Sequence, residues 1–257
     1  MLSKWLRPTL PGLTAVFFLA HPDDEFFCLP LISAEVQGGR SVHVVYLTDG
    51  GPLASTRERE TLQVLSEAGV LRDNVRFAGR EEGWSDGGLH RKLGEVRSWL
   101  TRYLTERGAC ARIYVPAWEG GHHDHDACFG VLASLMRDQV TGSAVCLQFP
   151  LYTGSGVPGP LFRCMVSLQA NGEVLSHRFG AREGARYWSF AAAYPSQWRT
   201  WVALGPAAAW GYLVRRSVLV QRVDPTRMKQ PPYVGTPYFE RRFGVPAGEV
   251  LAALRSL

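Results

Sequence analysis

The 257-residue sequence has no apolar run of the roughly 18–20 residues that span a bilayer, which argues against an integral membrane protein. Its five cysteines are an odd number and include no C-x-x-C pair, so they cannot all pair within the chain. We expect free, mostly buried thiols in a reducing compartment and predict a cytoplasmic protein. The apolar stretch near the N-terminus runs directly into a polar motif, so residues 1–12 are expected to form a short leader rather than a secretory signal.

Acidic residues are scarce in the second half of the chain. Residues 1–150 hold 15 Lys and Arg against 18 Asp and Glu, whereas residues 151–257 hold 13 against 5. Histidine is distributed the other way, since six of the seven histidines lie at or before His125. We therefore expect the chemistry in the first half. The second half should present a basic surface that suits an anionic substrate, membrane phosphates or nucleic acid.

The first 150 residues alternate β-rich apolar segments with helical ones. N-capping residues and glycines separate the segments, as Ser55 and Gly69 do for one helix. We predict strands over 13–20, 41–48, 74–79, 111–117 and 143–150, and helices over 25–39, 55–69, 89–108 and 125–139. This series predicts an α/β fold, Rossmann-like, with a mainly parallel sheet and helices on both faces.

After residue 150 the pattern becomes irregular. Residues 163–180 are typical of a hairpin that turns at Asn171-Gly172. Residues 196–216 are apolar, with a proline and a glycine inside the segment. Because no long linker separates the two halves, we predict one domain over residues 1–257, with a core at 13–150 and an irregular, β- and loop-rich elaboration at 151–257.

Three predicted strands end in unusually polar segments. These are residues 21–25 (HPDDE) after the first strand, 48–51 (TDGG) after the second and 122–125 (HHDH) beyond the fourth. The carboxyl ends of parallel strands meet at one edge of a sheet, which is where open α/β sheets bind ligands. Three adjacent carboxylates also repel one another unless a cation lies among them. The sequence therefore predicts a metal site at this edge.

A catalytic zinc takes three protein ligands and keeps one position for water. His21 and Asp24 lie three residues apart on one turn, and His125 can reach them from across the sheet, so we predict these three as ligands. Asp23 then stays beside the metal as a free carboxylate, which a general base requires. His122 is placed to stabilise charge on a carbonyl oxygen under attack. Such a site also accepts Fe²⁺ or Co²⁺ in place of Zn²⁺.

Other residues of these segments have structural explanations. Glu25 can simply start a helix, where an acid complements the helix dipole. A helix N-cap role is by itself enough to explain Asp124. Asp49, followed by two glycines, is typical of a turn, and His123 is as consistent with a solvent-facing residue as with a ligand.

The motifs resemble those of the PIG-L/LmbE-like zinc N-deacetylases, which remove acetyl groups from N-acetylglucosamine-type sugars. The resemblance covers roughly residues 13–135 and rests on AHPDDE, TDGG and the H-x-D-H pattern that ends at His125. Weaker matches are an Arg-x-x-Glu segment at Arg57 and Glu60 and an acidic loop at Asp86.

The resemblance implies a zinc-dependent deacetylase with the same three ligands and the same general base. It also implies that His122, oriented by Asp124, stabilises the tetrahedral oxyanion or protonates the leaving amine. Arg57 and Asp86 would contact sugar hydroxyls. The substrate would be an N-acetylated amino sugar or glycoconjugate, and the basic second half would suit a phosphate- or lipid-linked one.

The chain departs from the family pattern at two places. His123 occupies a position that is usually proline, which adds a competing nitrogen near the third ligand. Residues 26–31 (FFCLPL) replace a small, glycine-rich stretch, so we expect a bulkier or more apolar pocket near that helix.

Two other functions stay open. A metal-dependent glycan-binding protein without turnover is the first, although binding alone has no use for a free carboxylate at Asp23. The basic, aromatic C-terminal region also has the composition of a single-stranded nucleic-acid binder, which is the weaker hypothesis. For residues 201–214, between Arg199 and Arg215, core packing is favoured over peripheral contact with the inner membrane face.

Overall fold

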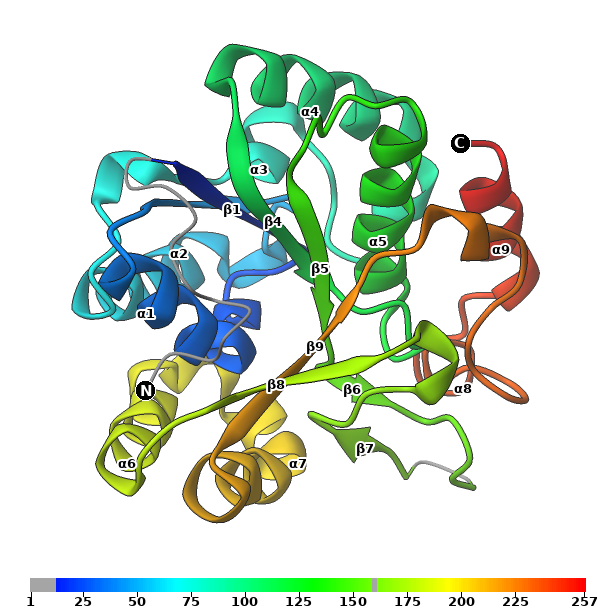
Figure 1. The fold of residues 1–257 in the computed structure, drawn as a ribbon. Helices are drawn as coiled ribbons and strands as arrows, with labels where there is room; N and C mark the ends of the chain where they lie inside the picture. The colour runs from blue at the N-terminus through cyan, green and yellow to red at the C-terminus, as the bar shows by residue number, and fades with distance from the viewer. Residues whose placement is uncertain (1–12, 159–160) are drawn as a thin grey trace.

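The computed structural model describes residues 13–158 and 161–257, and its central sheet has the strand order β3-β2-β1-β4-β5-β9-β8 (Figure 1). The parallel strands are β1 (Thr14–Leu19), β2 (Ser41–Tyr46), β3 (Val75–Arg76), β4 (Cys110–Pro116) and β5 (Val145–Phe149). Strands β9 (Ser217–Arg222) and β8 (Val174–Arg178) continue the sheet in antiparallel orientation. The predicted α/β fold with a mainly parallel sheet is confirmed. The leader expected at residues 1–12 lies outside the described residues.

The central strand β1 is apolar from its second residue onward because both of its faces are covered. Successive side chains of a strand point to opposite faces, so Phe17 belongs to one hydrophobic core and Phe18 to the other. Both side chains are fully buried. A strand of this kind carries a continuous apolar run rather than an alternating one, which explains the sequence of residues 14–19.

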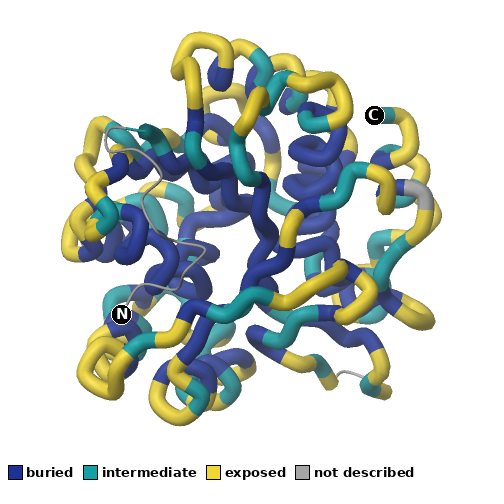
Figure 2. The backbone as a smooth tube through the Cα atoms, in the orientation of Figure 1, coloured by how far each residue is buried: buried dark blue, intermediate teal, exposed yellow. Residues whose placement is uncertain are grey.

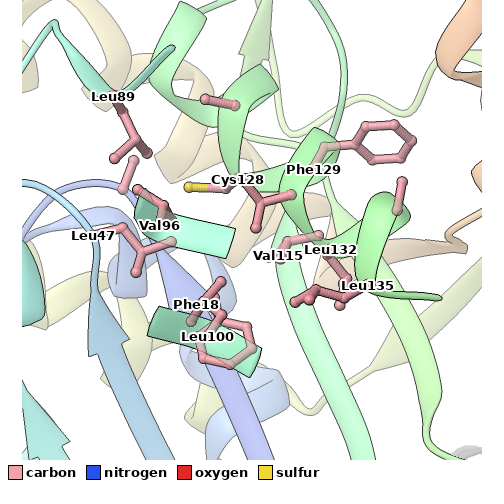
Figure 3. Packing of buried hydrophobic residues seen from close by; sticks show 14 of the residues in the cluster. Phe18, Leu47, Leu89, Val96, Leu100, Val115, Cys128, Phe129, Leu132 and Leu135 are labelled. Carbon is pink, nitrogen blue, oxygen red and sulfur yellow. The ribbon is translucent and has the colours of Figure 1, made fainter. Parts of the chain in front are cut away.

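Helices pack on both faces of the sheet. One face is covered by α3 (Ala78–Glu82), α4 (Leu93–Arg107), α5 (His123–Arg137) and α9 (Ala247–Arg255). The other face is covered by α1 (Leu29–Gln37), α2 (Ala54–Glu67), α6 (Ala181–Ser189) and α7 (Trp198–Ala209). Figure 3 shows Leu100 of α4 beside Phe18, and Leu132 of α5 near Val115 in the same core. Figure 2 shows the buried sheet inside a shell of exposed helical turns and loops.

The strand order places a crevice at the carboxyl end of β1. From β1 the chain builds outward through β2 to β3, then returns to add β4 and β5 on the other side of β1. The connections after β1 and β4 therefore leave in opposite directions, which opens the sheet edge between them. The segments 21–25 and 122–125 follow these two strands, so the topology brings both to this crevice.

The hairpin predicted at Asn171-Gly172 is wrong. β7 (Arg163–Cys164) pairs with β6 (Tyr152–Thr153), whereas β8 pairs with β9. The reason is that the turn is anchored to the protein interior: Asn171 is buried and its Nδ2 donates to Trp118 O at 2.8 Å. Residues 151–257 also contain helices α6 to α9, with α8 at Tyr238–Phe243, in addition to the expected strands and loops.

The apolar segment 196–216 forms α7 and a π-helical turn, Trp210–Arg215, that continues it. One face of this helix packs inward through Leu204, Ala208 and Tyr212, in agreement with the predicted core packing. Across residues 13–158 and 161–257, no helix is both long and apolar enough to cross a membrane. All five cysteines are free and buried, as predicted.

Candidate functional site

A cavity of about 190 Å³ lies at the carboxyl ends of β1 and β4. Seven of the eight residues predicted for the site line it: His21, Asp23, Asp24, Arg57, Asp86, His122 and His125. The eighth, Asp124, lies behind the cavity wall and is fully buried. The topology thus assembles the residues that sequence analysis singled out, although they come from four separate segments.

The turn after β1 is held by Asp24. Its Oδ2 accepts hydrogen bonds from the backbone N–H groups of Ala20 (3.1 Å) and His21 (2.8 Å), which would otherwise be unsatisfied at the strand end. The preceding residue, Asp23, adopts a left-handed backbone conformation with a φ of 115°, which is unusual outside glycine. This strained turn points the Asp23 carboxylate into the cavity, where it lines the wall beside Asp24.

Glu25 holds this turn from behind and does more than start a helix. Its Oε2 accepts from the Asp23 backbone N–H (2.9 Å) and from Tyr46 Oη (2.8 Å). Its Oε1 accepts from Thr61 Oγ1 (2.7 Å) and Tyr194 Oη (2.8 Å). The side chain is fully buried, so four donors share one carboxylate away from water. Glu25 therefore connects the strained turn to β2, α2 and the C-terminal segment.

Replacing Glu25 by alanine should lower the free energy of unfolding by ~2–5 kcal/mol, because several buried donors would lose their acceptor. Urea denaturation of the full chain measures this. Glu95→Ala is the matched control, since Glu95 is exposed and pairs with Lys92 at the surface, and it should lower stability much less than Glu25→Ala. Equal stability losses for the two variants would contradict the role assigned to Glu25.

His21, Asp24 and His125 bring their ligand atoms within 4.8 Å of one another. Asp24 Oδ1 lies 3.1 Å from His125 Nε2, and Asp24 Oδ2 lies 3.6 Å from His21 Nδ1. All three residues are buried. His125 Nδ1 is buried and has no hydrogen-bond partner among the described residues. The cluster is a compact set of two imidazoles and one carboxylate at the cavity wall.

The carboxylate of Asp124 contacts His21 more closely than His122. Its Oδ2 lies 3.2 Å from His21 Nε2 and accepts from the Gly87 backbone N–H (2.7 Å), while its Oδ1 accepts from Leu89 N–H (3.0 Å). The distance from Asp124 Oδ2 to His122 Nδ1 is 3.9 Å. The structure therefore places Asp124 where it orients the His21 ring, a contact that spacing in the sequence did not indicate.

His122 is the N-cap of α5. Its Nδ1 accepts a hydrogen bond from the Asp124 backbone N–H at 3.2 Å, so the ring proton resides on Nε2. Burial and the neighbouring His21 hold the pKa of His122 well below its usual range, which keeps the ring neutral. The ring lies 4.8 Å from that of Phe243, and both line the cavity. His122 thus offers a neutral N–H donor.

His123, the residue that departs from the expected proline, lies away from the cavity. Its Nε2 is 2.8 Å from Gly87 O, and its ring packs edge-on against that of His90. It belongs to a second cluster with His90 and Asp124 rather than to the trio that contains His125. The competing nitrogen expected from the sequence is therefore separated from His125 by the direction of the helix.

Arg57 connects three loops beneath the cavity. Its guanidinium donates to Pro22 O and Gly50 O and pairs with Asp23 Oδ1 (3.2 Å) and Asp86 Oδ2 (3.1 Å). Burial raises the pKa of Asp23 to about 7, although Arg57 opposes this shift. With its amide oriented to match its neighbours, Gln197 donates to Asp23 Oδ2 at 3.2 Å and accepts from Arg57 Nε at 3.0 Å.

The remaining motif residues fix the loops. Asp49 Oδ1 accepts from the backbone N–H groups of Gly51 (3.0 Å) and Asp86 (2.9 Å), which confirms Asp49 as a turn residue and positions the Asp86 loop.

The loop after β4 passes close to Tyr152. A Cβ at Gly121 would lie 1.8 Å from Tyr152 O, so only glycine fits there. This close approach brings Tyr152 to the cavity next to His125.

Comparison with known proteins agrees with this geometry. Residues 16–136 match the PIG-L family, which is described as GlcNAc-PI de-N-acetylase. The match covers just under half of the chain. The family match ends at the close of α5 and includes every residue predicted for the site.

Solved structures share the fold of this chain at low sequence identity. The teicoplanin deacetylase Orf2, in its zinc-inhibited form, is 14% identical, has a TM-score of 0.60, and the match covers 82% of this chain and 99% of that one. An N,N'-diacetylchitobiose deacetylase from Pyrococcus horikoshii is 16% identical with a TM-score of 0.60, covering 88% and 90%. No curated protein gives a significant match.

Several residues that line the cavity lie beyond the PIG-L match. They come from segments without a recognisable motif: Tyr152, Gln197, Trp201 and Phe243. Only the aromatic enrichment of the second half hinted at them, and that signal does not tell a pocket wall from a core. Tyr152 packs against His125 and Phe243 against His122, so these segments add aromatic side chains to the wall beside the histidines.

Proposed function

We propose that this protein, which matches the PIG-L family over residues 16–136, is a divalent-metal-dependent hydrolase that removes the N-acetyl group from an N-acetylglucosamine-type amino sugar or glycoconjugate. The observation that carries the proposal is the His21, Asp24 and His125 cluster with the Asp23 carboxylate beside it in one cavity. The family description and the deacetylase activity named for the structural neighbours support the reaction class. Residues 13–150 and 151–257 both contribute to the cavity, so we infer that they act as one domain.

The donor set of the cluster suits a divalent metal. Asp24 Oδ1 lies 3.1 Å from His125 Nε2 and Asp24 Oδ2 lies 3.6 Å from His21 Nδ1, so all three residues have a donor atom close enough to share one ion. His21 Nε2 faces Asp124, so His21 Nδ1 is left as the ligand atom, with a carboxylate behind it as is common for metal-bound histidine. Zinc, Fe²⁺ and Co²⁺ all suit this donor set.

The metal, when bound, would supply a Lewis acid that polarises the acetamide carbonyl and makes water more acidic. Asp23 accepts the proton that water loses as its oxygen attacks the carbonyl carbon. His122 donates its Nε2–H to the carbonyl oxygen as negative charge builds there. When the C–N bond breaks, the proton on Asp23 passes to the leaving nitrogen, and acetate and a free amine result. Asp124 acts through His21, whose ring it orients.

The sugar would lie over Arg57 and Asp86 at the cavity floor. Arg57 already interacts with two carboxylates and two carbonyl oxygens. Its main role is therefore to position Asp23 and Asp86, and contact with the sugar is a secondary role. Asp86 keeps more than a quarter of its side chain exposed and can accept from a sugar hydroxyl. Tyr152 and Trp201 offer aromatic faces on which a sugar ring can stack.

A second cavity of about 200 Å³ adjoins the first and would hold the group attached to the sugar. The two cavities share Tyr152 and Phe243, and the second is also lined by Arg199 and Arg242. An anionic aglycone suits these arginines. Replacing both by alanine should raise KM about 3–10-fold for a conjugate with an anionic aglycone and leave a neutral glycoside unchanged. Steady-state kinetics on the two substrates measure this, and an equal rise for both would contradict it.

Acetate release from a panel of N-acetylglucosamine conjugates tests the proposed function. The panel contains simple glycosides, a diphosphate-linked sugar and a chitin oligomer, with metal-loaded protein and an Asp23→Ala control. Release that depends on Asp23 supports the deacetylase, and the preferred member identifies the aglycone. If every member stays intact while the protein binds them in a metal-dependent way, the chain is a glycan-binding protein and the proposal fails.

A further inference from the structure

Helix α7 forms one wall of the cavity. Thr200, Trp201 and Leu204 line it, and Leu204 continues inward as part of the second hydrophobic core with Ala208. In Figure 1, α6 and α7 lie together, away from α4, α5 and α9. One face of this helix is therefore buried, in part against the cavity and in part in the core.

The opposite face of α7 and of the π-helical turn after it is apolar and exposed. From residue 198 onward, every fourth residue is apolar and exposed to solvent. We call these five residues the α7 stripe: Trp198, Val202, Pro206, Trp210 and Val214. Trp198 is 60% exposed, Val202 72% and Trp210 62%. A regular row of large apolar side chains in water, two of them tryptophan, marks an interaction surface rather than scattered exposure.

The chain segment that carries the α7 stripe has charged side chains of one sign. No Asp or Glu occurs between Glu183 and Asp224, whereas this segment contains five arginines. Arg199 and Arg216 are exposed near the two ends of the stripe, and the Arg199 guanidinium lies 5.3 Å from the centre of the Trp198 ring. Glu60, which reaches this region from α2, is buried and accepts hydrogen bonds from Ser196.

We propose that the α7 stripe docks on the surface of an anionic lipid bilayer. Tryptophan side chains favour the boundary between headgroups and acyl chains, and exposed arginines at both ends attract anionic headgroups. A second copy of the chain is a less suitable partner for the α7 stripe. Two-fold packing of the stripe against itself would bring the end arginines of the two copies together, and the segment holds no acid to pair with them.

The proposal goes beyond the deacetylase function and does not depend on it. Because α7 is one helix diameter thick, about 10–12 Å, docking would hold the cavity wall at the membrane surface without any spanning segment. Substrate that resides in or near the bilayer would then meet the cavity at high local concentration. Vesicle binding can be measured on protein with no added substrate, so it stands or falls separately from acetate release.

Co-sedimentation of the full chain with vesicles tests the proposal. Vesicles that contain phosphatidylglycerol are compared with vesicles of phosphatidylcholine alone, at low and high salt. The variant Val202→Asp places a charge in the α7 stripe, and Val234→Asp is the matched control, since Val234 is 79% exposed but lies before α8, outside the stripe. Circular dichroism verifies that both variants fold.

We expect wild type and Val234→Asp to sediment with the anionic vesicles, and Val202→Asp to bind on the order of tenfold more weakly. Brominated lipid should quench tryptophan fluorescence in wild type and less in Trp198→Ser/Trp210→Ser. Binding that high salt abolishes but Val202→Asp leaves unchanged would overturn the proposal, because arginines alone would then explain it. A dimer that Val202→Asp dissociates, with no vesicle binding, would also overturn it and assign the stripe to a second copy.

Discussion

Replacing Asp23 by asparagine should lower kcat for acetate release by ~10²–10⁴-fold, the usual effect of losing a general base. The amide keeps the shape of the side chain and its hydrogen bonds to Arg57 and Gln197 in part, but it cannot accept a proton from water. Steady-state kinetics of the metal-loaded protein measure the change, and KM should move little.

Asp49→Asn is the matched control for this variant. Asp49 follows the neighbouring strand at the same sheet edge, but it does not line the cavity and its Oδ1 only accepts two backbone N–H bonds. An asparagine Oδ1 can accept the same bonds, so activity should stay near that of wild type. If Asp23→Asn kept near-full activity, the base would have to be another group and the mechanism above would be wrong.

Replacing His125 by alanine should reduce the metal content of the purified protein from about one ion per chain to almost none, because two ligands rarely hold a catalytic metal. Activity should fall on the order of 10²–10⁴-fold, the contribution of a Lewis acid worth several kcal/mol. Elemental analysis by inductively coupled plasma mass spectrometry measures the metal, and acetate release measures activity.

His123→Ala is the internal control, since it removes a histidine two residues away that lies outside the cavity. Its metal content and activity should stay close to those of wild type, while stability should fall because the bond to Gly87 O is lost. Loss of metal in His123→Ala with retention in His125→Ala would reverse the assignment and favour the cluster of His90, His123 and Asp124.

The half of the chain with regular periodicity could be predicted from its sequence. The segment 15–19 is apolar because both sheet faces are covered, and polar residues at two strand ends meet because parallel strands end at one edge. That argument predicts that His21, Asp24 and His125 lie close together. It depends on local patterns, which a single sequence displays directly.

Contacts between distant segments could not be predicted in this way. Asn171-Gly172 has the composition of a hairpin turn, yet a bond to Trp118 O, over fifty residues earlier, decides its conformation. Gln197 reaches Asp23 from a segment with no motif. Glu25 shows the same limit, because its partner Tyr194 adjoins it only after the C-terminal segment folds over the core. In each case a tertiary contact outweighs local preference.

Acetate release from a simple N-acetylglucosamine glycoside, before and after removal of metal, tests the central claim most directly. The full chain is assayed as metal-loaded protein, after chelation, and after a divalent metal is restored, with acetate and free amine both quantified. We predict that the two products appear in equal amounts, disappear on chelation and return with the metal. Equal turnover in chelated and metal-loaded protein would contradict a metal-dependent deacetylase built on His21, Asp24 and His125.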